Sequence, residues 1–299
     1  MTQKTWVHIF FAFSIVFVQA ASADVFYVAS DGSGTPPFNS WFTAATDPQV
    51  AIELANVTAG GPHRVWVKKG VYKPQFNPHT AASIPREYCF ALRNNVEVYG
   101  GFAGTESSLE QRDPITNQTI LSGDRGTSDT WHDGTLIVDG SGNFNPPPTG
   151  DPGQDLPVLE NYTNVYHVIY NSDQSPEIVA GALLDGVIVT GGNAEGPGQG
   201  NGGGMYNYYN DDSSSPALTN CTFSGNSAQF GGGMYGSGTL TDCTFSGNSA
   251  QFGGGMMGEG TLTDCTFGGN SAQFGGGMLG EGTLTGCTFG GNSAEFGGG

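Results

Sequence analysis

Residues 238–259 read GTLTDCTFSGNSAQFGGGMMGE and residues 260–281 read GTLTDCTFGGNSAQFGGGMLGE, so these two 22-residue units differ only at Ser246/Gly268 and Met257/Leu279. The same period extends over residues 213–299 and is a signature of an architecture in which each unit stacks on the next. Its columns are Leu218, Leu240, Leu262, Leu284; Cys221, Cys243, Cys265, Cys287; Phe223, Phe245, Phe267, Phe289; Asn226, Asn248, Asn270, Asn292; Phe230, Phe252, Phe274, Phe296; and Met234, Met256, Met278.

Each unit contains several short strands and no helical periodicity. Residues 239–245 are rich in Thr and apolar residues, as strands are, and a second short strand is expected within residues 251–256. Residues 246–248 and 258–260 have turn composition. One unit cannot bury its own apolar face, whereas stacked coils pair their backbones at ~4.8 Å and cover one another's core. The sequence therefore predicts an all-β fold, a single-stranded right-handed parallel β-helix with 22 residues per coil.

Identical residues in successive coils should form ladders. We expect the Leu, Cys and both Phe columns to point inward, and the Asn side chains to hydrogen-bond from coil to coil at a turn. Leu240 and Cys243 are three residues apart, so strict alternation fails and a bend or bulge is expected near Thr241 or Asp242.

The Cys column admits two interpretations. The expected spacing of its Cα atoms suits disulfides, but side chains in register point the same way, which disfavours the required dihedral angle. Buried free thiols that act as small apolar side chains are the preferred interpretation. Cys89 has no obvious local partner.

The N-terminal residues predict export. Lys4, an apolar run over residues 6–18 and the small-x-small motif at 21–23 indicate a signal peptide at residues 1–23. We divide the rest into an N-terminal cap with the first coils at 24–95, irregular coils with loops at 96–212, and regular repeats at 213–299. A short amphipathic helix from Pro48 to Val57 should cover the open end. No later segment is apolar enough to span a membrane, and the repeats are expected to continue beyond Gly299.

Two resemblances follow from these residues. The Phe-x-x-Asn motif of Phe245 and Asn248, followed by Gly-Gly-Gly-Met at 253–256, resembles the repeat of the polymorphic outer-membrane proteins, where Gly-Gly-Ala-Ile is usual. Residues 27–32, 65–72, 96–102 and 119–124 resemble the opening coils of bacterial pectin-lyase-like β-helix proteins. These resemblances imply a β-helix exported to the extracellular or outer-membrane surface. They imply less about activity, because this fold serves lyases, hydrolases, adhesins and inert stalks.

Charge is distributed unevenly along the chain. Residues 1–125 hold nine Lys and Arg against ten acids, a net charge of −1, whereas residues 126–299 hold 17 acids and no Lys or Arg. A surface with a net charge of −17 repels nucleic acid and anionic lipid, so neither is an expected partner.

The sequence contains few of the residue combinations that a catalytic site requires. A lyase needs a cationic base, and the coils after Arg125 carry none; a hydrolase needs clustered carboxylates at a defined separation. Asp211-Asp212 is an acidic doublet in a Ser-rich loop, and neither His132 nor His167 has a catalytic sequence context. Asp242 and Asp264 would stack in adjacent coils, as would Glu259 and Glu281. Two such carboxylates could hold a Ca²⁺ ion with water. We prefer the interpretation that they are solvated carboxylates without a metal. We assign no catalytic, cofactor-binding or metal-binding residue and expect no cofactor.

Two functional classes remain. The first is a secreted structural or adhesive protein at the cell surface, without catalytic activity, that contacts a host or matrix protein or a glycan. The alternative is a polysaccharide-active enzyme, similar to pectate lyases or glycoside hydrolases, with its site on the loops of residues 126–212. The sequence indicates neither the partner nor the oligomeric state.

Overall fold

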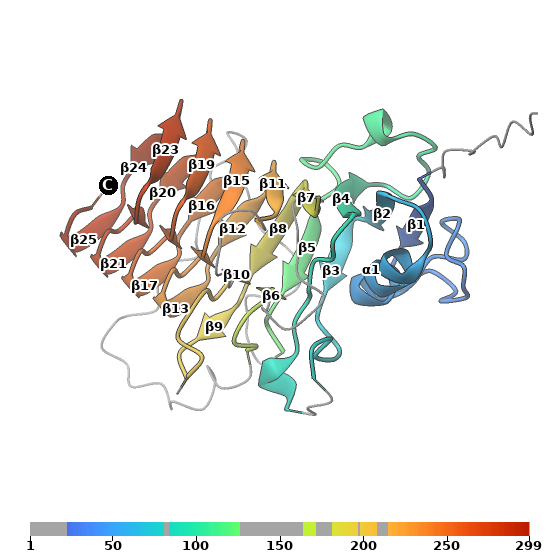
Figure 1. The fold of residues 1–299 in the computed structure, drawn as a ribbon, viewed down its shortest axis with the longest axis horizontal. Helices are drawn as coiled ribbons and strands as arrows, with labels where there is room; N and C mark the ends of the chain where they lie inside the picture. Colours follow the sequence, from blue (N-terminus) through green and yellow to red (C-terminus); the bar gives the residue numbers. More distant parts are fainter. Residues whose placement is uncertain are drawn as a thin grey trace, which may run out of the picture.

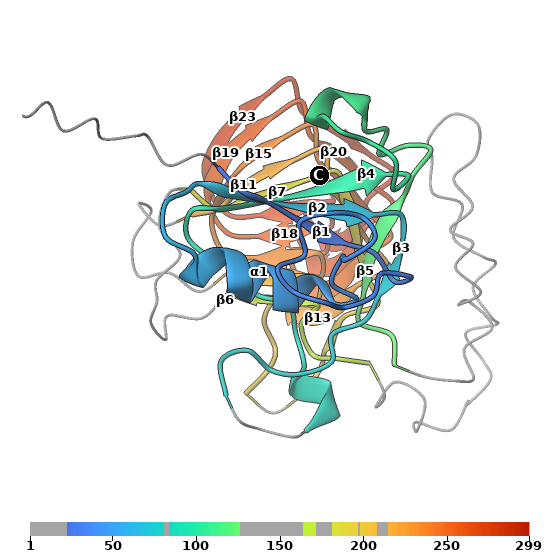
Figure 2. The same ribbon diagram turned by 90° about the vertical axis from the view of Figure 1, so that its right-hand side faces the viewer.

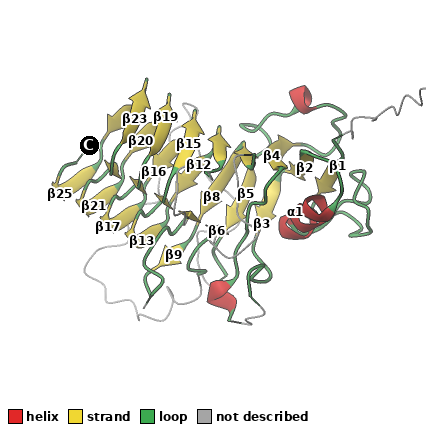
Figure 3. Cartoon of the chain, viewed as in Figure 1, coloured by secondary structure: helices red, strands yellow, loops and turns green. Residues whose placement is uncertain are grey.

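The computed structural model describes residues 23–80, 84–125, 164–171, 181–196, 198–207 and 215–298. Its strands stack as successive coils from the N-terminal helix to the last strand (Figures 1 and 3). Leu218, Leu240, Leu262 and Leu284 pair in register from coil to coil, all in parallel strands. The predicted all-β parallel β-helix with its 22-residue period is therefore confirmed.

Within the described residues the parallel strands form four sheets. We number the sheets in the order in which a regular coil meets them. The first holds β1 (Val25–Val28), β2 (His63–Lys68), β4 (Val96–Phe102), β7 (Leu183–Asp185), β11 (Ala217–Thr219), β15 (Gly238–Thr241), β19 (Gly260–Thr263) and β23 (Gly282–Thr285). The second holds β3 (Gly70–Tyr72), β5 (Thr119–Ser122), β8 (Val187–Thr190), β12 (Thr222–Ser224), β16 (Thr244–Ser246), β20 (Thr266–Gly268) and β24 (Thr288–Gly290).

The third and fourth sheets are shorter. The third holds β9 (Asn193–Ala194), β13 (Ser227–Phe230), β17 (Ser249–Phe252), β21 (Ser271–Phe274) and β25 (Ser293–Phe296). The fourth holds β6 (Ile169–Asn171), β10 (Met205–Asn207), β14 (Met234–Tyr235), β18 (Met256–Met257) and β22 (Met278–Leu279). The strand expected over residues 239–245 is therefore two strands, β15 and β16, and Ser249–Phe252 is the third strand of the regular unit. The strand expected over residues 251–256 is interrupted by three glycines, and Met256 starts a strand of another sheet.

The core consists of stacked layers of identical side chains. Leu240, Cys243, Phe245 and Met256 are each at most 1% exposed. The Phe245 ring lies 4.9 Å from that of Phe223 and 4.8 Å from that of Phe267, and the rings are almost parallel. The inward Leu, Cys and first Phe columns are thus confirmed, and the Met column joins them in the core.

The second Phe column does not belong to this core, contrary to the sequence-based expectation. Phe230, Phe252 and Phe274 are only half-buried, and Phe296 is 60% exposed. The glycine triplet explains this position. A Cβ atom on Gly255 would lie 2.9 Å from Cδ1 of Phe267, so the chain after Phe252 returns tightly against the core. Phe252 is left at the end of its strand, β17, next to the tight return.

Asparagine side chains close one corner of every regular coil. Asn248 Oδ1 accepts hydrogen bonds from the backbone N and from Nδ2 of Asn226, both at 3.1 Å. Asn248 Nδ2 donates to the Phe223 carbonyl and to Asn270 Oδ1, both at 2.9 Å. The predicted Asn ladder is confirmed, and it satisfies backbone groups that the turn would otherwise leave unpaired.

The predicted bend also occurs, at the residue between the first and second sheets. Asp242 and Asp264 have φ of 52°, Asn220 has φ of 50° and Gly286 has φ of 66°. Asn, Asp and Gly are the residues that adopt left-handed backbone at least cost. Backbone conformation therefore explains why this column varies among these three residue types.

All five cysteines are unpaired in the structure, and the Cys column points inward without disulfides. Each thiol of the Cys column donates to a carbonyl of the preceding coil; Cys243 Sγ lies 3.5 Å from the Leu218 oxygen. Hydrogen bonding within the thiol column, together with burial, raises the pKa of Cys243, and burial raises the pKa of Cys89 to about 12. These shifts keep Cys243 and Cys89 neutral, whereas the hydrogen bond with Cys243 lowers the pKa of Cys265 to about 7.

The helix α1 (Pro48–Val57) covers the N-terminal end of the coils, as expected (Figure 2). Asp47 caps its first turn by accepting from the Gln49 amide at 2.8 Å, and Ala51, Ile52 and Ala55 join the same core as Val28 and Val65. Two 3-10 turns, Pro85–Glu87 and Leu109–Gln111, lie in connecting segments. Among the described residues, no helix combines the length and apolarity needed to cross a membrane.

Candidate functional site

The loops considered for an enzymatic site lie mostly outside the described residues. His132, Asp211 and Asp212 are among the residues outside them. His167 is described and buried, with Nδ1 2.9 Å from the Gly202 oxygen and Nε2 3.0 Å from Gln199 Oε1. Burial lowers its pKa. Because protein groups occupy both ring nitrogens, this histidine has a structural role in holding the loop around residues 199–202.

The repeated acidic residues occupy corners. Asp242 and Asp264 take left-handed backbone there, and Glu259 and Glu281 lie between the corner glycines that precede β19 and β23. Among the described residues, no three His, Cys, Asp or Glu side chains come together as a metal site would require. The repeated carboxylates lie at the turns of successive coils.

The regular coils present a uniform outer surface. On the first sheet, Thr alternates with inward Leu, and the outward residues form two columns that we call the Thr face: Thr239, Thr261, Thr283 and Thr241, Thr263, Thr285. On the third sheet, the side chains of exposed Gln229 and Gln251 and of half-buried Gln273 donate along the axis to the next Gln or to Glu295, at 3.2–3.3 Å. These columns repeat the same hydroxyl and amide groups at every coil.

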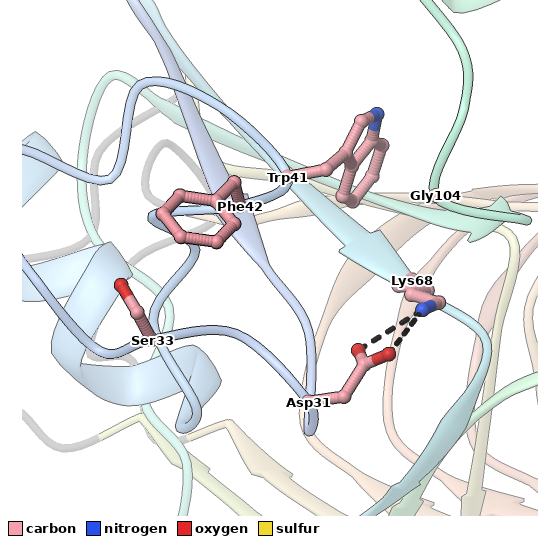
Figure 4. Close-up of a pocket in the computed structure, with 6 residues that line it drawn as sticks. All are labelled: Asp31, Ser33, Trp41, Phe42, Lys68 and Gly104. Atoms are coloured by element: carbon pink, nitrogen blue, oxygen red, sulfur yellow. Dashed lines mark hydrogen bonds and ion pairs between the residues drawn. The ribbon is translucent and has the colours of Figure 1, made fainter.

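A site built from residues that do not repeat along the chain lies at the N-terminal end of the molecule, beside α1. Asp31, Ser33, Trp41 and Phe42 come from the loop after β1, Lys68 ends β2, and Gly104 follows β4. Together they line an open cavity of about 350 Å³, which we call the cap pocket (Figure 4). Its volume is at the lower end of the range for small-molecule sites.

One wall of the cap pocket is an ion pair. Lys68 Nζ contacts both carboxylate oxygens of Asp31, at 2.7 and 3.0 Å. The hydrogen bond from Lys68 lowers the pKa of Asp31. Gly104 has φ of 97°, and a Cβ atom there would lie 2.9 Å from Cδ and Cε of Lys68. A glycine at this position is what allows the lysine stem to lie along the loop.

The opposite wall is aromatic. The Trp41 ring packs 4.7 Å from that of Tyr27 and 5.5 Å from that of Phe102, and its Nε1 donates to the Glu106 oxygen at 3.0 Å. Its neighbour Phe42 is 81% exposed. Trp41 is thus anchored, whereas most of the Phe42 side chain is exposed to solvent.

Sequence reasoning missed the cap pocket. Asp31 and Lys68 are 37 residues apart, and no motif joins them. The one available signal was Trp41-Phe42, two adjacent large aromatic residues in a loop rich in Gly, Pro and Ser, because only one of two neighbouring side chains can point into the core there.

Comparisons with protein-family models, with curated proteins and with solved structures found no match for this chain. The polymorphic outer-membrane repeat therefore remains a resemblance, and functional inference rests on the geometry of the molecule.

Proposed function

We propose that this chain is an exported, non-catalytic structural or adhesive protein that displays a long, regular surface outside the cell. The observation that carries the proposal is the repetition of the same outward groups, coil after coil, on the Thr face and along the Gln column. A catalytic centre requires different residues brought to one place, whereas a spacer or an adhesive surface benefits from identical groups at a fixed interval.

Two further features support this proposal. The signal-like segment at residues 1–23 favours export, and neutral Thr and Gln columns on an acidic chain favour solubility with adhesion to uncharged partners. Contacts that are individually weak gain strength when many equivalent groups bind together. A matrix protein or glycan with its own repeat is the kind of partner that such a surface fits.

The test is a pair of assays on the purified chain of residues 24–299. It should release neither unsaturated products nor reducing ends from pectin or polygalacturonate, with or without millimolar Ca²⁺. It should instead bind to immobilised matrix proteins or glycans. Hydrolytic or lyase activity that falls in Asp211→Asn or Asp212→Asn would overturn the proposal and favour the enzyme.

A further inference from the structure

We propose that the cap pocket is a saccharide-binding site that takes one neutral sugar unit against Phe42 and Trp41, with sugar hydroxyls bound by Asp31 and Lys68. This inference deepens the proposed adhesive function, on which it rests, by naming a contact point and the chemistry of its ligand.

The aromatic wall suits the apolar face of a sugar ring. A pyranose presents several C–H groups on one side, and aromatic rings bury such a surface while their faces carry partial negative charge. Phe42 is 81% exposed, although large aromatic side chains contribute most when they are buried. Figure 4 shows the Phe42 and Trp41 rings on the side of the hollow opposite the Asp31–Lys68 pair. A flat, partly apolar ligand between them would cover the exposed Phe42 surface.

The polar wall suits the rim of hydroxyls on the same ring. Asp31 accepts and Lys68 donates, and the two groups are adjacent, with Nζ to Oδ2 at 2.7 Å. Neighbouring hydroxyls each act as donor and acceptor, so one can donate to the carboxylate while the next accepts from the ammonium. Ser33 also lines the pocket, and its hydroxyl donates to Thr35 Oγ1 at 3.1 Å.

Charge selects against acidic sugars. The Lys68 charge is already compensated by Asp31, whose side chain is 69% exposed and lines the hollow. A uronic acid would bring a second carboxylate to Asp31 on a chain with a net charge of −18. A neutral hexose meets no such repulsion.

The pocket is preorganised, which lowers the entropic cost of binding. The loop carrying its aromatic residues is held by hydrogen bonds from Ser33 N to the Phe42 oxygen at 3.1 Å and from Gly34 N to the Ala44 oxygen at 3.0 Å. Glu106 fastens the facing loop, because its carboxylate accepts from the amides of Ala103, Gly104 and Thr105 at 2.6–2.9 Å. The two walls are therefore set before a ligand arrives.

The experiment measures binding of chain 24–299 to immobilised oligosaccharides of glucose, galactose, mannose and N-acetylglucosamine, with oligogalacturonate as the acidic comparison. The best neutral ligand is then titrated by calorimetry. We expect Phe42→Ala to weaken that binding about tenfold or more. Asp31→Asn and Lys68→Met should weaken it too, the latter while keeping the stem that packs along Gly104.

The matched control is Val57→Ala, which trims another exposed apolar side chain, 75% exposed, at the same end of the molecule. It should bind as the unmodified chain does, and thermal unfolding should show every variant folded. Unchanged affinity in Phe42→Ala, binding of oligogalacturonate alone, or binding of no neutral saccharide would each overturn the inference. Those outcomes leave the proposed non-catalytic function standing, because lyase or hydrolase activity in the separate enzymatic assays is what contradicts it.

Discussion

The substitution Phe245→Ala tests the assignment of the two Phe columns against Phe252→Ala in the same coil. Both rings stack on their equivalents above and below, Phe245 at 4.9 and 4.8 Å and Phe252 at 5.2 and 5.0 Å. Ring stacking is therefore nearly the same at the two positions. They differ in burial, because Phe245 is 0% exposed and Phe252 is half-buried.

The expected costs follow from that difference. Removing a buried Phe costs about 3–5 kcal/mol, through lost transfer free energy and the cavity that remains. The cavity at Phe245 cannot close easily, because a Cβ atom on Gly233 would lie only 2.8 Å from its Cδ1 and the coils above and below are fixed by paired backbone. Phe252→Ala removes a ring that is already partly in water and leaves no closed cavity, so we expect about 1 kcal/mol.

Urea titration followed by circular dichroism measures both variants under one set of conditions. Because the two residues share a coil, they report on the same cooperative unit, and Gln251→Ala, on an exposed residue, supplies a baseline near zero. Equal destabilisation by the two Phe variants, or a larger effect of Phe252→Ala, would refute the division of the columns into core and surface.

Three further predictions use the same unfolding assay. Asn248→Ala should cost about 2–4 kcal/mol, because it leaves the Asn226 amide and the Phe223 carbonyl without their side-chain partner; a cost near zero would contradict a structural Asn ladder. Asp264→Gly should be nearly neutral whereas Asp264→Val should cost about 1–2 kcal/mol, since φ is 52° there; similar behaviour of the two variants would contradict the left-handed corner. Burial lowers the pKa of His167 below its ordinary value of 6.5, so the unfolded chain takes up the proton first as the pH falls. Stability should decline as the pH falls below about 6.5, down to the folded-state pKa, and His167→Gln should flatten that decline, with half-buried His79 contributing in the same direction. An unchanged pH profile in His167→Gln would argue against a buried neutral imidazole.

Much of the fold was predictable because a repeat specifies its own contacts. Residues that are 22 positions apart must be neighbours if the units stack, so register, ladders and the Asn hydrogen bonds follow from the period. The capping helix was equally local, since Pro48 to Val57 has its own N-cap and apolar stripe. The composition of the strands and the residue types at the turns were the remaining signals that predicted the fold.

The period alone could not show whether a column of side chains points into the core or lies at the surface. Identity at intervals of 22 is the same for Phe245 and Phe252, and only the path of the backbone through residues 253–255 places the first inside and the second at the sheet's far end. The left-handed corner at Asp242 was likewise expected only as a bend, because the exact φ depends on how two sheets meet.

The candidate site depended on tertiary structure throughout. The cap pocket joins a loop after β1, the end of β2 and the residue Gly104, none of which repeats or forms a motif. The amino-acid sequence therefore specifies the stacked coil, because residues 22 positions apart are also the residues that contact one another from coil to coil. Only the folded chain decided where Asp31 meets Lys68, because that contact arises from two non-repeating segments whose separation in sequence carries no periodic signal.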